Sequence, residues 1–237
     1  METENVLVTP PAVGTIRSVE PGRAVEWLAA GFRAFMKLPA FWAISGLIII
    51  FVSWLLGMFP FFGSALSSAF TVVAIGALMR AHLVIDRGGD PAAEAQKAAG
   101  STPLWILGAL NGAAILALAI AMMVMGMSSL GMLMVAGGGL GPMILVSVLM
   151  MLVLTAVITM AFWLAPALVA LRGVNPVEAV KLSFAASLKN LVPFVIFFVL
   201  AMLACMATVI TLGLAMIVVL PALIAATYAA YNEIFPA

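Results

Sequence analysis

Six long runs of apolar residues dominate the hydrophobic pattern of this chain, with short polar or glycine-rich segments between them. The runs cover residues 40–59, 64–85, 104–125, 143–169, 191–212 and 214–231. A helix needs about 20 apolar residues to cross the hydrocarbon core of a bilayer, and each run comes close to or exceeds that length. The turns inside the first and last pairs are very short. The pattern predicts an all-α polytopic membrane protein with six transmembrane helices arranged as three hairpins.

Composition supports a membrane protein and removes several function classes. Of the 237 residues, 66% are hydrophobic and 8% are charged, against about 25% charged in a soluble domain. The net charge of +1 provides no overall attraction for nucleic acid. Cys205 is the single cysteine, which excludes an intramolecular disulfide and a cysteine-cluster metal site. We therefore expect no nucleic-acid partner, no metal and no cofactor.

The charged residues all fall on one side of the predicted topology. Short cytoplasmic loops of membrane proteins carry an excess of Lys and Arg, and a cytoplasmic amino terminus places all ten basic residues inside. They are Arg17, Arg23, Arg33, Lys37, Arg80, Arg87, Lys97, Arg172, Lys181 and Lys189. The nine acidic residues and His82 share those segments. This distribution predicts a bacterial inner-membrane protein with both termini in the cytoplasm. Residues 1–20 are predicted to be a mobile cytoplasmic tail, and residues 21–237 one membrane domain.

Each predicted hairpin follows a similar polar segment. Arg-Gly-Gly-Asp-Pro at residues 87–91 parallels Arg-Gly-Val-Asn-Pro at residues 172–176, and Glu20-Pro21 is a shorter version. Asp90 and Asn175 are good N-caps placed directly before a proline, which favours helix initiation. We therefore predict three tandem units at residues 21–85, 86–171 and 172–237. In each unit a cytoplasmic interfacial helix precedes a two-helix hairpin.

The predicted interfacial helices are amphipathic, as helices that lie on a membrane surface are. In residues 23–37 the charged side chains gather opposite an apolar face that includes Trp27, Phe32 and Phe35. In residues 176–191 an apolar stripe runs from Val177 through Phe184 to Leu188. The residues of one polar edge, which we expect to hydrogen-bond a neighbouring helix, are Ser183, Ser187 and Asn190. Candidate contacts to anionic lipid headgroups are Arg33, Lys37, Lys181 and Lys189, since basic residues near the inner leaflet attract such lipids.

Several segments carry a resemblance to known proteins. They are Gly31-Phe32-Arg33, the run Ala-Phe-Trp-Leu-Ala-Pro-Ala-Leu-Val at residues 161–169, Pro-Val-Glu-Ala at residues 176–179 with Ser183 and Asn190, and the ending around Tyr228, Tyr231 and Ile234-Phe235. In these segments the chain resembles a group of uncharacterised six-pass bacterial inner-membrane proteins. It is more distantly similar to the YciC-like proteins and to the membrane domain of some glycerophosphodiester phosphodiesterases. The resemblance implies a six-pass architecture and supplies no established activity or site residues.

One polar cluster stands at the predicted inner end of the second span. It consists of Arg80, His82 and Asp86, and the last two have the i, i+4 spacing that allows contact on a helix. A charge at the centre of a membrane helix costs about 2.5 to 3.5 kcal/mol on insertion scales, so it marks a functional candidate such as a proton or anion site. The interpretation we favour places the cluster at the headgroup level, where Arg80 can extend toward water.

The third span contains a second notable pattern. Gly108 and Gly112 form a GxxxG motif with Asn111 between them, which indicates close helix packing and one interhelical hydrogen bond. We favour packing inside the chain over dimerisation. After this span, the glycine-rich residues 126–142 predict an outside turn. Nearby Met123, Met125, Met127, Met132, Met134 and Met143 could in principle bind Cu(I), but we interpret them as flexible apolar packing.

No nucleophile–base pair, paired carboxylates or metal-ligand cluster stands out in the sequence, so we do not expect an enzyme. The leading hypothesis is a non-enzymatic scaffold, assembly or envelope factor that acts with unknown protein partners and the lipid bilayer. The alternative is a small-solute transporter or channel. The polar residues available inside the spans are Asn111, Thr155, Thr159, Thr208 and Thr211. A polar lumen lined from all three units would favour transport, and a dry, packed centre would favour a scaffold.

The one-sided charges generate a topology prediction. Reporter fusions at Gly63, Gly138 and Gly213 should be active only outside the inner membrane. Fusions after Asp90, Gly173 and Ala237 should report the cytoplasm. A strong reversal at any of these sites would contradict six spans with cytoplasmic termini.

Overall fold

The chain folds entirely into helices and connecting turns in the part that the computed structural model describes, residues 15–85, 87–136 and 141–236. The helices are α1 Arg23–Lys37, α2 Pro39–Gly57, α3 Gly63–Ile85, α4 Pro91–Ala99, α5 Thr102–Ala136, α6 Gly141–Phe162, α7 Ala165–Arg172, α8 Pro176–Lys189, α9 Leu191–Ala207 and α10 Met216–Ile234. A short 3₁₀ turn, Thr208–Thr211, follows α9. Six segments of the described chain are long and apolar enough to span a membrane. The all-α polytopic fold and its six candidate spans are thus confirmed.

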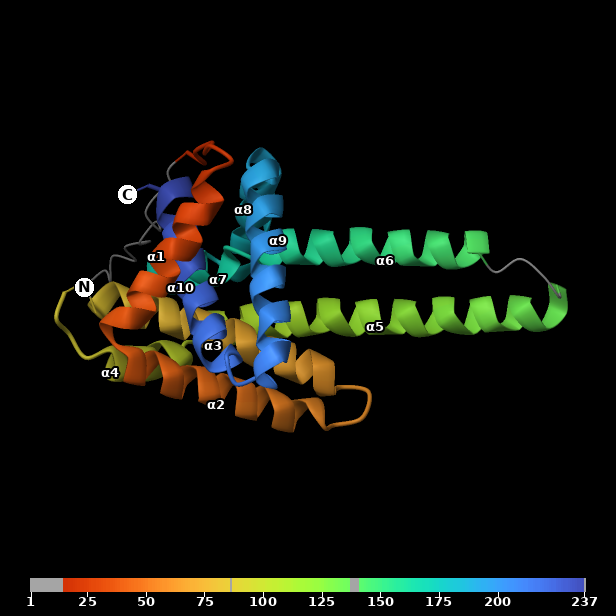
Figure 1. The fold of residues 1–237 in the computed structure, drawn as a ribbon, viewed down its shortest axis with the longest axis horizontal. Helices are drawn as coiled ribbons and strands as arrows, with labels where there is room; N and C mark the ends of the chain where they lie inside the picture. Colours follow the sequence, from red (N-terminus) through yellow and green to blue (C-terminus); the bar gives the residue numbers. More distant parts are fainter. Residues whose placement is uncertain (1–14, 86, 137–140, 237) are drawn as a thin grey trace, which may run out of the picture.

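The spans form the three predicted hairpins, and a shorter helix precedes each one. The hairpins are α2–α3, α5–α6 and α9–α10, preceded by α1, α4 and α8 respectively. Figure 1 shows α5 and α6 side by side, reaching well beyond the other helices. The third hairpin runs across the first two instead of lying alongside them (Figure 1). Helices that cross cannot pack along their whole length, and the space at this crossing is the candidate site described below.

The glycine-rich outside turn is shorter than the sequence predicts. Residues 126–136, expected to be part of that turn, continue α5, and Gly141 already begins α6. Residues 137–140 of the expected turn lie outside the described residues. Met, Leu and Ala, which favour helices, fill most of the positions between these glycines and keep the helix intact. With 35 residues, α5 is about 52 Å long at 1.5 Å per residue.

Two of the three predicted helix starts have the expected side-chain caps. The Asp90 carboxylate accepts hydrogen bonds from the backbone N–H groups of Ala92 (2.9 Å) and Ala93 (3.3 Å). The Asn175 side chain accepts one from the N–H of Val177 at 3.0 Å. At the first unit α1 begins at Arg23 with no side-chain cap, consistent with Glu20 being a poor capping residue.

The apolar face of α1 packs against the protein itself. Figure 1 shows α1 running beside α10. A Cβ atom added to Gly31 would collide with the carbonyl oxygen of Ala222 and with Ala226 on α10, so only glycine permits this approach. Trp27 and Phe35 are buried, whereas Phe32, which the sequence assigns to the same face, is half exposed. The apolar surface of α1 that could contact lipid is therefore smaller than the sequence predicts.

Residues 15–20, the described end of the predicted mobile tail, are fixed to the rest of the chain. The Asn190 side chain accepts from the N–H of Val19 (2.8 Å) and donates to the carbonyl of Arg17 (3.0 Å). Lys189 Nζ donates to the carbonyl of Ile16 at 2.6 Å, and the N–H of Arg17 donates to the carbonyl of Ile234 at 2.8 Å. These bonds to α8 and α10 fix a segment that hydrophobic periodicity alone left unassigned. Residues 1–14 of the tail lie outside the described residues.

The fourth span is broken just before Pro166. Helix α6 ends at Phe162 and α7 begins at Ala165, because a proline clashes with the preceding helical turn. The Ser183 hydroxyl of α8 bridges the break: it accepts from the N–H of Leu164 (3.0 Å) and donates to the carbonyl of Met160 (2.9 Å). Ser187 donates to the same carbonyl at 3.2 Å. The predicted polar edge of this helix therefore does bond a neighbouring helix.

Ser183→Ala and Ser187→Ala are a matched pair of variants at this break. Both hydroxyls are fully buried, but only Ser183 holds both groups of the interrupted backbone bond. We expect Ser183→Ala to lower the free energy of unfolding by about 1–3 kcal/mol, the cost of leaving a buried polar group unpaired. Ser187→Ala should cost less, because Ser183 still satisfies the Met160 carbonyl. Thermal unfolding midpoints in mild detergent would measure both, and equal losses would contradict the bridging role.

Candidate functional site

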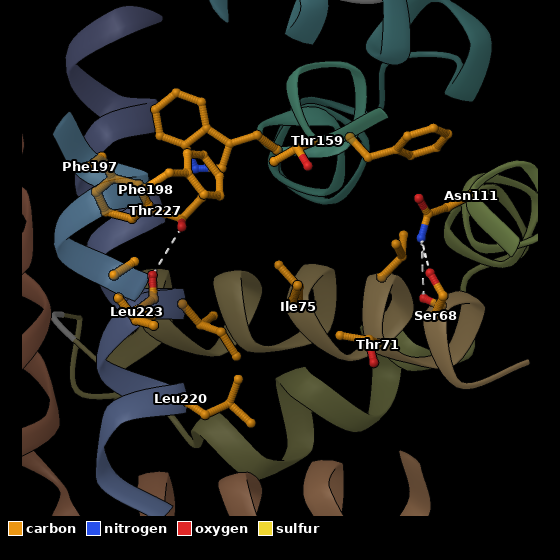
Figure 2. Close-up of a pocket in the computed structure, with 15 residues that line it drawn as sticks. Ser68, Thr71, Ile75, Asn111, Thr159, Phe197, Phe198, Leu220, Leu223 and Thr227 are labelled. Atoms are coloured by element: carbon orange, nitrogen blue, oxygen red, sulfur yellow. Dashed lines mark hydrogen bonds between the residues drawn. The ribbon is translucent and has the colours of Figure 1, made fainter. Parts of the chain in front are cut away.

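A cavity of about 440 Å³ lies where the three hairpins meet, a volume typical of small-molecule sites. Its walls come from the middle parts of five spans, α3, α5, α6, α9 and α10. The lining residues are Ser68, Thr71, Val72, Ile75, Asn111, Thr159, Phe162, Trp163, Phe197, Phe198, Ala201, Leu220, Leu223, Ile224 and Thr227. Figure 2 shows these side chains around an open centre. None of them is charged.

Close packing of α3 and α5 builds one side of the cavity. A Cβ atom on Gly108 or Gly112 would lie 2.6 or 2.8 Å from a backbone oxygen of α3, too close for any residue but glycine. The GxxxG motif is thus used inside the chain, as predicted. It brings Asn111 against α3, where the Asn111 amide donates to the hydroxyl and the carbonyl of Ser68.

The break in the fourth span builds the opposite side. Trp163 lies in the break and is buried. Its ring packs against Phe194, Phe197 and Phe198 of α9, with centroids 5.2, 5.4 and 5.6 Å away. The Trp163 indole N–H is buried and has no hydrogen-bond partner among the described residues. This aromatic group joins α6 to the third hairpin and closes the cavity with apolar surface.

The threonine hydroxyls of the cavity present mainly acceptors. Thr71, Thr159 and Thr227 each donate to a carbonyl one turn earlier on their own helix, at 2.8, 2.8 and 3.0 Å. A hydroxyl has one hydrogen and two lone pairs. Once its hydrogen is used in this way, the oxygen can only accept from a ligand. The wall therefore combines apolar surface with a few fixed, uncharged polar groups, as small-molecule pockets do.

Within the described residues, Arg80 and His82 of the predicted cluster Arg80, His82 and Asp86 contact different parts of the protein. Arg80 pairs with Glu94 of α4, with Nε 2.9 Å from Oε1, and donates to the Ala170 carbonyl at 3.2 Å. The hydrogen bond from Arg80 holds the pKa of the Glu94 carboxyl below its ordinary value. Arg80 thus ties α3 to α4 and α7, which is a structural role. Asp86 lies outside the described residues.

His82 is placed among aromatic rings of other helices. Its ring centroid lies 4.3 Å from that of Tyr228 on α10 and 5.8 Å from that of Trp42 on α2. Residues two apart on a helix point in different directions, which explains why His82 and Arg80 separate. His82 does not line the central cavity.

The four candidate lipid contacts, Arg33, Lys37, Lys181 and Lys189, are all exposed. Lys189 also holds the amino-terminal segment through the Ile16 carbonyl. Val177 and Leu188, from the predicted apolar stripe of α8, are exposed as well, while Phe184 is partly covered. The small residues and serines of α8 face the protein, and Val180 and Phe184 of the stripe also pack partly against its core.

The methionine-rich end of the second hairpin is described only in part. Met123 and Met127 are more than half exposed, so they are not core packing as predicted. Met125 lines a separate pocket between α5 and α6. The side chains of Met132, Met134 and Met143 lie outside those described. Within the described residues, no group of three or more His, Cys, Asp or Glu could hold a metal ion.

Sequence reasoning found part of the cavity. It named Asn111 and Thr159 as polar residues inside spans, and both line the cavity. It missed Ser68, Thr71 and Trp163. The two hydroxyl residues belong to a run of small polar side chains in the second span, which is a usable signal. Nothing in the pattern showed that Trp163 would turn toward α9.

Comparison with protein-family models, curated proteins and solved structures finds no match for this chain.

Proposed function

We propose that this chain is a non-enzymatic, multi-pass carrier of the bacterial inner membrane that holds a small uncharged molecule in its central cavity. The observation that carries the proposal is the cavity itself, which lies at mid-span and is lined from all three hairpins. A lining from every hairpin is one part of the criterion for transport. The other part is a polar lumen, and here Ser68, Thr71, Asn111, Thr159 and Thr227 supply polar groups in a wall that is otherwise apolar. The absence of charged lining residues restricts the cargo to an uncharged molecule, because an unpaired ion is costly in an apolar site.

The structure supports the proposed orientation, with both termini in the cytoplasm. The described ends of the chain lie together, joined by the bond from Arg17 to Ile234 and by bonds from Arg172 to the carbonyls of Phe235 and Pro236 (2.6 and 2.9 Å). Figure 1 shows α4 and the loop before it at one end of the molecule, and the far ends of α5 and α6 at the other. Arg87 and Lys97 belong to that loop and to α4, and we assign their end to the cytoplasm.

A scaffold role is the second candidate, and the second hairpin favours it. Among the described side chains of α6, only Met160 is buried by the rest of the chain. Exposed apolar residues of α6 include Leu145, Leu149, Leu152 and Val153. Lipid alone would cover this surface, but another membrane helix would cover it equally well. The resemblance to six-pass inner-membrane families stays a prediction and does not choose between the two roles.

Cysteine accessibility separates a carrier from a dry scaffold. In a Cys205→Ser background reconstituted in liposomes, Thr159→Cys should react with a small, water-soluble methanethiosulfonate, because a carrier must open its cavity to water. Ala186→Cys, buried between helices and away from the cavity, is the unreactive control, and exposed Glu178→Cys the reactive one. If Thr159→Cys stays as unreactive as Ala186→Cys with reagent on both sides, the carrier proposal fails.

We also propose that the exposed basic residues favour anionic lipid at the cytoplasmic face. Each can contribute about 1 kcal/mol of attraction near the headgroups, and nearby acidic residues cancel part of it. Native mass spectrometry with competing phosphatidylglycerol and phosphatidylethanolamine should show a modest anionic preference. Neutralising Arg33, Lys37, Lys181 and Lys189 together should remove it. An unchanged preference in that variant would show that these residues are not the lipid-binding surface.

A further inference from the structure

We infer that the central cavity is built for a neutral amphipathic alcohol, a molecule with a hydroxyl head and an apolar body. This inference rests on the proposed carrier function and names the class of molecule carried. It follows from the way polar and apolar groups divide the cavity wall. In Figure 2, Asn111 and Ser68 lie on one side of the open centre, and Phe197, Phe198 and Leu220 on the opposite side. The cavity is thus itself amphipathic.

The polar side can both accept from and donate to a ligand. The Asn111 Nδ2 atom lies 3.5 Å from the Ser68 carbonyl, which can only accept, so this contact favours the orientation in which Nδ2 points to Ser68. Asn111 Oδ1 is left as an acceptor. The Ser68 hydroxyl accepts from Asn111, and its own hydrogen has no acceptor among the described residues. Together with the acceptor oxygen of Thr159, this corner offers acceptors and one donor.

An alcohol head matches this corner better than a ketone, an ester or a charged head. A hydroxyl both donates and accepts, so it can pair with Asn111 Oδ1 and with the Ser68 hydroxyl at once. A ketone or ester can only accept and would leave the Asn111 and Thr159 oxygens unpaired. An ammonium or carboxylate would be an unpaired ion in an uncharged cavity, which is costly.

The opposite side fits an apolar body. Phe197 and Phe198 of α9 and Leu220 and Leu223 of α10 face the centre in Figure 2. Thr227, also on this side, already donates to the Leu223 carbonyl, as the dashed line shows. A sugar or polyol would place its hydroxyls against these apolar groups and lose hydrogen bonds to water without replacement. A pure hydrocarbon would leave the polar corner unsatisfied.

Photolabelling of the purified full chain in nanodiscs tests the inference. The probe is a 1-decanol analogue with a diazirine in its chain. We expect saturable crosslinks to residues 197–201 and 220–227, competed by 1-decanol more strongly than by decane, decanoate or decylammonium. Monooleoylglycerol serves as a second competitor. Competition by monooleoylglycerol would indicate an alcohol-headed membrane lipid as the natural ligand. Competition by 1-decanol but not by monooleoylglycerol would indicate a free alcohol.

Variants identify the head-binding corner. Loss of one hydrogen bond, about 0.5–1.5 kcal/mol, should weaken 1-decanol competition roughly three- to tenfold in Asn111→Leu. Asn111 also bonds α3, so its replacement can disturb helix packing as well as ligand binding. The Thr159 hydroxyl bonds only its own helix, so Thr159→Val tests ligand binding without disturbing the contact between α3 and α5. Thr155→Val, which lines the separate pocket between α5 and α6, is the matched control and should bind as the wild type does.

Three results would overturn the inference: no saturable labelling, equal competition by decane and 1-decanol, or an unchanged alcohol preference in both Asn111→Leu and Thr159→Val. These results are independent of the cysteine experiment. If Thr159→Cys reacts but the cavity shows no preference for the alcohol, the inferred ligand class is rejected and the carrier proposal is kept. Selective alcohol binding with an unreactive Thr159→Cys would support the ligand class and reject the carrier.

Discussion

The Ser183 hydroxyl, inserted into the broken backbone of the fourth span, is the interaction on which the rest of the structure depends. In a bilayer every backbone group must find a partner within the protein, since no water is available. Pro166 forces the break, which leaves the Leu164 N–H and the Met160 carbonyl without their partners in the helix. Ser183 satisfies both from α8. The helix that precedes the third hairpin is thereby fixed against the second, and the third hairpin then crosses the others at a defined place.

That crossing explains why a cavity exists in a bundle otherwise packed through small residues. Gly108 and Gly112 let α5 lie directly on α3, and Gly31 does the same for α1 on α10. Such contacts leave little space. The crossing of the third hairpin cannot be closed in the same way, because the side chains of α6 and α9 that meet there are large and aromatic. The direction of the crossing helices therefore determines where the cavity lies. The residues at the middle of each span determine its lining.

The sequence allowed the spans, the hairpins and the N-caps to be predicted, because each rests on local information. Apolar length defines a span, and Asp90 or Asn175 before a proline defines a helix start. The GxxxG motif even predicted the contact of Asn111 with a neighbouring helix. The crossing of the third hairpin could not be predicted, since it depends on contacts between residues far apart in the chain, such as Ser183 with Leu164. The continuation of α5 was not predicted, because the glycines of this stretch favour a turn. The helix-forming residues between them outweigh that preference in the structure.

The walls of the cavity differ in how firmly they are held, and this difference points to where it can open. Helix α10 is fixed at its end by Arg23 and Trp27, both bonded to the Glu233 carboxylate, at 2.6 and 2.7 Å. Helices α3 and α5 pack closely at Gly108 and Gly112, where there is no side chain that could move aside. Among the described side chains of α6 only Met160 is buried, and its carbonyl is held by Ser183 and Ser187, so the part of α6 before Met160 can move with the least loss of packing. Its outer face is apolar and exposed, so an opening there would admit a ligand from the hydrocarbon core, in addition to the opening to water that a carrier requires. A neutral amphipathic molecule is soluble in that layer, whereas a charged one is not, so the least restrained wall and the uncharged lining favour the same class of ligand.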